Sequence, residues 1–159
     1  MSATTDIAVR PATDADALTI AAFNVAMAHE TEHKMLDATT VNAGVRGLLS
    51  RPEYGFYRVA ETEGRVIGCL VVTFEWSDWR NGLFWWIQSV YVPPGCRRRG
   101  VFKALYQSVA TDAGNTPGVC GLRLYVEQDN STAQQTYCAL GMTETQYRLF
   151  EAATMPKKG

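Results

Sequence analysis

The spacing of hydrophobic positions predicts two helices near the start of the chain. Apolar side chains recur at helical intervals across residues 14–32, where Asp14 can cap the first turn, and again across residues 40–49. A short strand at residues 7–10 is expected before them, and Pro11 ends it. The chain therefore begins with one strand and two helices.

The middle of the chain changes to a strand pattern. Three segments rich in aromatic and β-branched residues, separated by tight-turn signals, are predicted strands: residues 56–62, 66–76 and 83–92. Residues 69–72 are all apolar, which predicts a strand that is covered on both faces.

Helices and strands alternate in the last part of the chain. The predicted elements are a helix at 100–113, a strand at 119–126, a helix from Asn130 or Ser131 to Leu140, and a strand at 145–150. This order predicts an α/β fold with a mixed sheet and helices on both faces. We expect a single domain over residues 1–159, with its core at about 7–150 and a disordered tail at 155–159.

Composition and charge narrow the class of protein. Hydrophobic residues make up 47% of the 159 residues and charged residues 19%, as in ordinary globular domains. A net charge of −1 gives no general attraction to nucleic acid or to a membrane surface. The first residues show no secretory pattern and no apolar run reaches the roughly 18 residues of a membrane span, so we expect a cytoplasmic protein.

The four cysteines predict neither a disulfide framework nor a metal site. Cys69, Cys96, Cys120 and Cys138 are widely spaced and form no Cys-x-x-Cys pair. This spacing favours four reduced thiols, and we expect no bound metal.

One loop carries candidate chemistry. Arg97, Arg98, Arg99 and Gly100 stand between a predicted strand and a predicted helix. The first N–H groups of a helix have no partner within it and lie at the positive end of its dipole, so they bind phosphate. Gly100 lets the backbone approach a pyrophosphate closely, and the arginines add positive charge. The alternative interpretation is a solvated surface loop; a nucleic-acid patch is disfavoured by the net charge.

This loop resembles the coenzyme A pyrophosphate loop of the GNAT superfamily of N-acetyltransferases, whose pattern is Gln/Arg-x-x-Gly-x-Gly/Ala. The chain has Arg97-Arg98-Arg99-Gly100-Val101-Phe102, with Phe102 in place of the final small residue. The resemblance extends over nearly the whole chain, and it includes the strand at 89–92 and the closing segment at 122–142. Two further stretches are similar to a functionally obscure subgroup of the superfamily, residues 74–82 and 85–88. The resemblance implies a three-layer fold with a mostly antiparallel sheet of six to seven strands.

The resemblance also implies the reaction and the cofactor side of the site. A primary amine attacks the thioester of acetyl-coenzyme A directly in a ternary complex. The strand at 89–92 is expected to splay from residues 122–126, so that its backbone binds the pantetheine arm and the Val90 N–H becomes the oxyanion donor. The implied cofactor-binding residues are Val90, Tyr91, Val92, Arg97, Arg98, Arg99, Gly100, Val101, Phe102, Lys103, Asn130 and Tyr137.

Tyr137 is the predicted general acid. A phenol has a pKa of about 10, so it is protonated at neutral pH and can donate to the leaving thiolate. Tyr137 matches the position of the catalytic tyrosine in the family, whereas a core tyrosine is the alternative. Asn130 matches a position that binds pantetheine, and a role as a helix cap is equally compatible with its place in the sequence.

The general base is left open by the sequence. Many family members have a glutamate on the strand before the loop, where this chain has Gln88. Glu30 is our first candidate, although a solvated helix end is the alternative interpretation and a water chain to a more distant carboxylate is another. The other candidates are Glu32, Glu75, His29 and His33.

The tryptophans and nearby acids suggest an acceptor. Trp76 and Trp79, with Glu75 and Asp78 beside them, suit a small cationic amine. The predicted acceptor pocket comprises Glu30, Glu32, Glu75 and Trp76. The same aromatic residues also fit a homodimer interface. The missing carboxylate at Gln88 raises a second hypothesis, a non-catalytic acyl-coenzyme A sensor; a structural dimer domain without a cofactor is a third.

Overall fold

The computed structural model describes residues 6–154, which belong to two compact units. Unit 1 is Met1–Tyr125 and unit 2 is Val126–Gly159. The predicted tail at 155–159 lies outside the described residues. Unit 1 contains β1 (Ala8–Pro11), η1 (Asp14–Asp16), α1 (Ala17–Glu32), α2 (Ala38–Leu49), β2 (Gly55–Thr62), β3 (Arg65–Ser77), β4 (Gly82–Tyr91), η2 (Pro94–Cys96), α3 (Val101–Asn115) and β5 (Val119–Arg123). Unit 2 contains α4 (Ser131–Ala139).

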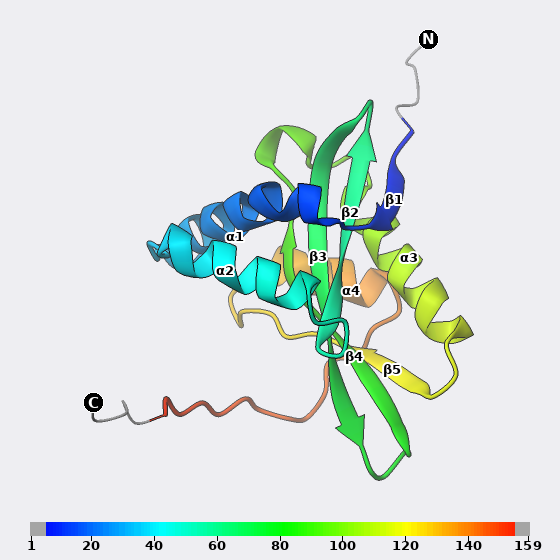
Figure 1. Cartoon of the computed structure of the whole chain (residues 1–159). Coiled ribbons are helices and arrows are strands. Elements are labelled where there is room, and N and C mark those ends of the chain that lie inside the picture. Colours follow the sequence, from blue (N-terminus) through cyan, green and yellow to red (C-terminus); the bar gives the residue numbers. More distant parts are fainter. Residues whose placement is uncertain (1–5, 155–159) are drawn as a thin grey trace. The chain divides into compact units, whose positions relative to one another are not determined.

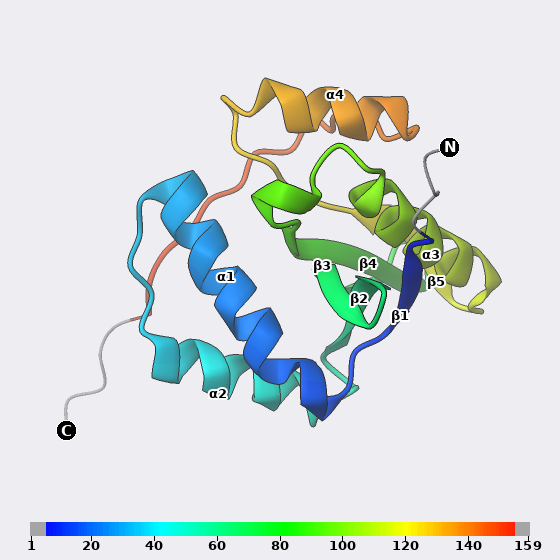
Figure 2. The same ribbon diagram turned by 90° about the horizontal axis from the view of Figure 1, so that it is seen from above.

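The sheet of unit 1 has its five strands in the order of the sequence (Figure 1). The pairs from β1 to β4 are antiparallel, and β4 pairs with β5 in parallel. Helices α1 and α2 lie on one side of the sheet and α3 lies on the other (Figure 2). The predicted mixed, mostly antiparallel sheet with helices on both faces is therefore confirmed.

The predicted number of strands was too high. The sheet has five strands, not six to seven, and residues 145–150 form no strand. Tyr147 and Phe150 are 74% and 90% exposed. The β-branched and aromatic composition of this segment fits a strand, but a strand also needs a partner for its backbone groups, and composition carries no information about such a partner. The strand predicted at 119–126 is also shorter, because it ends at Arg123.

The core of unit 1 holds the two helix layers against β3. Ile20 and Val45 pack with Val59 and Cys69 on the α1–α2 side. On the other side, Gly68 lets the first turn of α3 approach the sheet, because a Cβ at Gly68 would lie 2.7 Å from Cγ1 of Val101. This close approach fixes the start of α3. No helix in the described part of the chain has both the length and the apolar composition to cross a bilayer.

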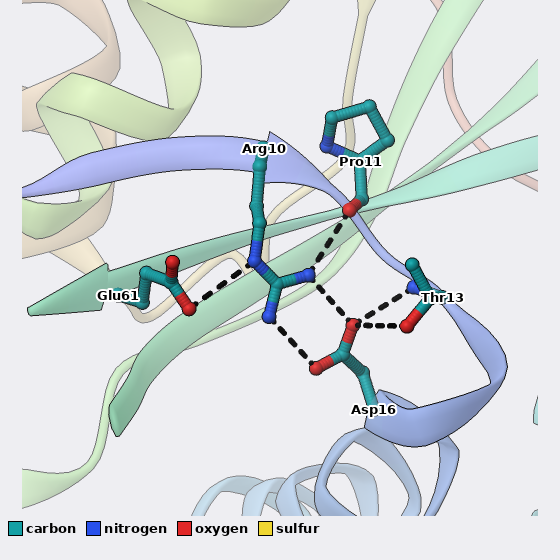
Figure 3. A network of polar contacts seen from close by, with 5 residues as sticks. All are labelled: Arg10, Pro11, Thr13, Asp16 and Glu61. Atoms are coloured by element: carbon teal, nitrogen blue, oxygen red, sulfur yellow. Dashed lines mark hydrogen bonds and ion pairs between the residues drawn. The ribbon is translucent and has the colours of Figure 1, made fainter. Parts of the chain in front are cut away.

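A network of charged groups ties β1 and β2 to the start of α1 (Figure 3). Arg10 donates two hydrogen bonds to the buried carboxylate of Asp16, at 2.8 and 3.0 Å, and the Thr13 N–H donates another at 2.8 Å. Arg10 also forms an ion pair with Glu61 at 3.2 Å. Arg10 and then Thr13 lower the pKa of Asp16 below its usual value, although burial opposes them. We call these four residues the Asp16 clasp.

We expect Asp16→Asn to lower the free energy of unfolding at pH 7 by about 2 kcal/mol, because it removes a buried charge partner from Arg10. The pKa of Asp16 is lower in the fold than in the unfolded chain. The clasp therefore stabilises the fold above about pH 4, and this contribution is lost as the pH falls through the folded-state pKa. Urea unfolding from pH 7 to pH 2 measures it, and the difference between the two proteins should shrink toward acid. Asp14→Asn is the control, because Asp14 is exposed and lies within η1, and the predicted capping of the helix by Asp14 was wrong: Asp16 is the N-cap of α1. A difference that does not depend on pH would contradict the account.

Candidate functional site

Strand β4 has two neighbours along its first half and one along its second. Its pairing with β5 runs from Leu83 opposite Val119 to Trp86 opposite Arg123. Its pairing with β3 continues to Tyr91. Residues 89–92 are therefore not paired with β5, as the expected splay requires. One edge of β4 is left available to a ligand that can pair with backbone groups.

A β-bulge lies in this second half of β4. Val71 is opposite Gln88 and Cys69 is opposite Tyr91, so two steps along β3 match three along β4. Ser89 lies within the bulge and has a φ of 50°, in the left-handed region. Bulges bend a strand and redirect its backbone groups. This one sits beside Val90, the predicted oxyanion donor.

The basic loop leads from β4 into α3. Gly100 is the N-cap of α3 with a φ of 79°, a conformation that favours glycine. A Cβ at Gly100 would have no atom within 4 Å, so the space in front of the helix start is open. Arg98 and Arg99 are exposed. Phe102, which departs from the family pattern, has its ring 6.2 Å from that of Tyr106 on the same helix. The loop thus combines positive charge, a helix N-terminus and room for an anion.

Glu30 connects α1 to this loop. Its carboxylate accepts from the Tyr91 hydroxyl at 2.8 Å and from a terminal nitrogen of Arg97 at 2.7 Å. The Nε of Arg97 donates to the Val92 carbonyl at 2.8 Å. The structure thus brings together four of the sequence-predicted site residues, Glu30, Tyr91, Val92 and Arg97. We call them the Glu30 cluster.

The Glu30 cluster weighs against the predicted role of Glu30 as a base. Hydrogen bonds from Arg97 and then from Tyr91 lower the pKa of Glu30 below its usual value. Burial, with help from the Glu30 carboxylate, raises the pKa of Tyr91, so this phenol stays protonated and keeps its bond to Glu30. A base with a lowered pKa has little drive to take a proton from an ammonium group.

Gln88 has two hydrogen-bond partners that the sequence did not predict. Its Nε2 donates to the Thr73 hydroxyl at 2.6 Å, and the Tyr125 hydroxyl donates to its Oε1 at 3.4 Å. Thr73 comes from β3, and Tyr125 follows β5, with its ring 5.9 Å from that of Trp86. Only the register of β3 on β4 places Thr73 here, and sequence spacing holds no signal for it. The position where many family members carry glutamate is therefore a neutral hydrogen-bonding site in this chain.

The contacts of the described residues do not connect the members of the predicted acceptor pocket to one another. Glu75 forms an ion pair with Arg123 at 2.6 Å, and Glu32 forms one with Lys34 at 3.7 Å. Trp76 is 61% exposed, near the end of the β3–β4 hairpin. Among the residues that the structure describes, the ion-pair partners of Glu75 and Glu32 differ from the hydrogen-bond partners of Glu30.

A mostly apolar cavity of about 530 Å³ lies between α1 and α2. One candidate base, His29, lines it. The lining residues are Leu18, Ala21, Ala22, Val25, Ala26, His29, Met35, Ala38 and Asn42. Sequence periodicity placed the apolar residues of α1 on a core face, and the tertiary structure leaves part of that face open.

The described residues hold no cluster of three His, Cys, Asp or Glu side chains placed to bind a metal ion. Cys69 is buried in the core, and burial raises the pKa of its thiol to about 12, so this thiol stays protonated.

Unit 2 carries two of the predicted site residues, Asn130 and Tyr137. Asn130 is the N-cap of α4, and its Oδ1 accepts from the Ala133 N–H at 3.1 Å. Tyr137 lies on α4 and is half-buried. Burial raises the pKa of Tyr137 above its usual value, which keeps the phenol protonated at neutral pH.

Comparisons with known proteins agree with the sequence resemblance. The model of the acetyltransferase (GNAT) family matches residues 19–142. The structure of a possible acetyltransferase from Clostridium difficile 630 is 41% identical, with a TM-score of 0.89 over 94% of this chain and 99% of that one. No curated protein matches the chain significantly.

Two structures of the aminoglycoside N-acetyltransferase AAC(6')-Iy are more distant and share the fold. One, in complex with the bisubstrate analogue CoA-S-monomethyl-acetylneamine, is 18% identical, with a TM-score of 0.75 over 95% of this chain and 100% of that one. The other, in complex with CoA, is 18% identical, with a TM-score of 0.73 over 98% of this chain and 99% of that one.

The bulge yields a prediction about stability. A β-branched residue at Ser89 would have to adopt a left-handed backbone conformation, so we expect Ser89→Val to lower the free energy of unfolding by about 1–2 kcal/mol. Ser89→Gly removes the same hydroxymethyl group without that strain, so it should lower the free energy of unfolding by less. Chemical denaturation of the two variants measures the difference. Equal costs would show that the left-handed conformation at Ser89 does not constrain the strand.

Proposed function

The chain belongs to the GNAT family and is an acetyl-coenzyme A-dependent N-acetyltransferase, and from that premise we propose which residues carry the reaction and which acceptor it takes. A small cationic primary amine attacks the acetyl carbon directly in a ternary complex. The single observation that carries this proposal is that β4 loses its β5 partner just before the basic loop and the start of α3. The open edge of β4 is thereby followed in the chain by an anion-binding site, which the basic loop and the N-terminus of α3 form.

Acetyl-coenzyme A suits this arrangement, because it has an amide-containing pantetheine arm for the strand edge and a pyrophosphate for the anion-binding site. Backbone groups of residues 90–92 bind the pantetheine arm. The N–H groups at the start of α3 bind the pyrophosphate, with Arg98 and Arg99 adding positive charge. The open space at Gly100 supports this assignment, because an anion can approach the helix end there. Arg97 also belongs to the acetyl-coenzyme A site, where it connects the loop to the Val92 carbonyl at the end of β4. Asn130 is assigned to the pantetheine arm through its match to the family pattern, a role compatible with capping α4.

The residues of the chain divide the chemistry between them. The Val90 N–H donates to the thioester oxygen, where negative charge develops as the amine nitrogen bonds to the carbonyl carbon. Tyr137 gives its proton to the sulfur as the C–S bond breaks, the attacking nitrogen loses its remaining extra proton to water, and solvent reprotonates the phenolate. Because burial raises its pKa, the Tyr137 phenol is protonated at neutral pH, as a proton donor must be. The family match to residues 19–142 includes parts of both units, which supports a single catalytic domain.

The amine loses its proton to water rather than to a carboxylate of the site. Gln88 cannot accept a proton at useful pH, and the lowered pKa of Glu30 makes it a weak base. His29, which lines the cavity between α1 and α2, is the alternative base.

The acceptor class is proposed from charge and from a structural neighbour. Asp78 stands beside exposed Trp76 and Trp79 in the sequence, and aromatic faces with a nearby acid attract cations. Glu75 is paired with Arg123 and contributes less to this attraction. A structure of AAC(6')-Iy in this fold holds an acetylneamine bisubstrate analogue, so aminoglycosides belong in a test panel with polyamines, amino acids and lysine peptides.

The second candidate function is a non-catalytic acyl-coenzyme A sensor, which the neutral Gln88 site favours. Thiol release from acetyl-coenzyme A across the panel separates the two. Release that depends on one class of amine establishes the enzyme and its acceptor. Coenzyme A binding without release on any amine supports the sensor.

We expect Tyr137→Phe to lower kcat by about 100-fold and to leave the affinity for coenzyme A nearly unchanged, because only the proton donor is lost. Thiol-release kinetics and calorimetry measure the two quantities. Tyr54→Phe is the matched control, since Tyr54 is exposed and lies outside the proposed site. Unchanged turnover in Tyr137→Phe would remove Tyr137 from the mechanism.

The pH profile tests the absence of a carboxylate base. Because the pKa of Glu30 is lowered, Glu30 stays deprotonated from pH 6 to 9 and adds no titration step there. We expect log(kcat/KM) for the amine to rise with a slope of about 1 from pH 6.5 to 8.5, following the deprotonation of an amine with a pKa of about 10. A plateau with an apparent pKa near 7 would instead indicate a histidine base, and its loss in His29→Gln would identify it.

A further inference from the structure

Glu30 joins three parts of unit 1 that are distant in the sequence. It lies in the last turn of α1, where it accepts from Tyr91 at the end of β4 and from Arg97 in the loop before α3. Arg97 also donates to the Val92 carbonyl. The Glu30 cluster therefore spans a helix, a strand and a loop through contacts of 2.7–2.8 Å.

Aromatic packing holds the cluster in place. The Phe23 ring of α1 lies 5.3 Å from the Tyr91 ring, and the Arg97 guanidinium lies 5.7 Å from the centroid of the Tyr91 ring. Arg97 thus has its Nε, one terminal nitrogen and a ring contact engaged by the protein. All three arginines of the loop are exposed, and Arg97 keeps 46% of its side-chain surface in solvent. They differ in their contacts, because among the described residues only Arg97 of the three has a side-chain hydrogen bond or ion pair.

We infer that Glu30 is a positioning residue for the acetyl-coenzyme A site, where it holds Arg97 on the Val92 carbonyl and so fixes the loop that leads into α3. This inference rests on the proposed function and deepens it. Arg97 shapes the loop, and Arg98, Arg99 and the first turn of α3 face the pyrophosphate. Preorganisation of this kind raises affinity because less of the loop has to be ordered when the ligand binds.

If Arg97 were instead a direct ligand of the pyrophosphate, the loss of the Glu30 charge would change the affinity for coenzyme A in the opposite direction. If Arg97 bound the pyrophosphate, Glu30 would compete for its guanidinium and would repel the anion by charge. Removing the charge of Glu30 would then strengthen the binding of coenzyme A. If Glu30 positions the loop, removing its charge weakens the binding instead.

The experiment is the affinity of the full chain for coenzyme A, measured by calorimetry for Glu30→Gln. We expect binding to be about three- to fivefold weaker, since partly exposed ion pairs contribute up to about that much. Arg97→Lys keeps the positive charge but cannot bond to Val92 and to Glu30 with a planar fork, so it should weaken binding by a similar factor. The double variant should be no weaker than the weaker single variant, because both changes break one cluster.

Glu53→Gln is the control. It removes the same charge from an exposed carboxylate in the turn before β2, outside the proposed site. Its affinity for coenzyme A should equal that of the native protein or slightly exceed it. Melting temperatures of all variants, measured without ligand, show whether each one is folded at the temperature of the binding experiment.

The outcomes separate this inference from the proposed function. If the native protein does not bind coenzyme A, the proposed function fails. If the native protein binds and Glu30→Gln binds equally or more tightly, the positioning role is overturned while the proposed function stands. If the Glu30→Gln variant is unfolded, Tyr91→Phe, which removes one hydrogen bond to Glu30 and leaves all charges, takes its place and should bind about twofold more weakly.

Discussion

The structure depends on a change in the pairing of β4. Its first half is hydrogen-bonded on both sides and its second half only to β3, with the change at Trp86 and Arg123. A bulge at Ser89 follows directly. Because backbone groups need partners, the second half of β4 is stable only where solvent or a ligand reaches its edge. Gly68 then allows α3 to start close to the sheet, near the end of β4.

Helix α1 is fixed at both ends by carboxylates. Asp16 joins its start to β1 and β2 through Arg10, and Glu30 joins its last turn to β4 and the basic loop through Tyr91 and Arg97. Between these two carboxylates the helix packs on the sheet with small and apolar side chains. Such packing fixes the distance between the helix and the sheet, but it only weakly fixes the position of the helix along the sheet. The charged contacts are directional, and they determine where the helix stops relative to the loop.

Much of the fold could be predicted because its signals are local. Period-two and helical spacing identified the elements from residue 7 to residue 140, and tight turns placed their boundaries within a few residues. The strand predicted at 145–150 was wrong because its composition says nothing about whether a partner strand is present. The phosphate loop could be predicted for the same reason as the helices, since Arg97 to Gly100 are consecutive.

The contacts that distinguish one site residue from the next could not be predicted. Glu30 and Arg97 are 67 positions apart, and the Gln88–Thr73 bond depends on the register of two strands. The sequence by itself determined the order of elements, the basic loop and the family, because each is encoded in neighbouring residues. Only the tertiary structure decided that Glu30 is engaged by Arg97 and Tyr91 and that β4 has an open edge, because hydrogen bonds between distant segments form only when packing brings those segments together.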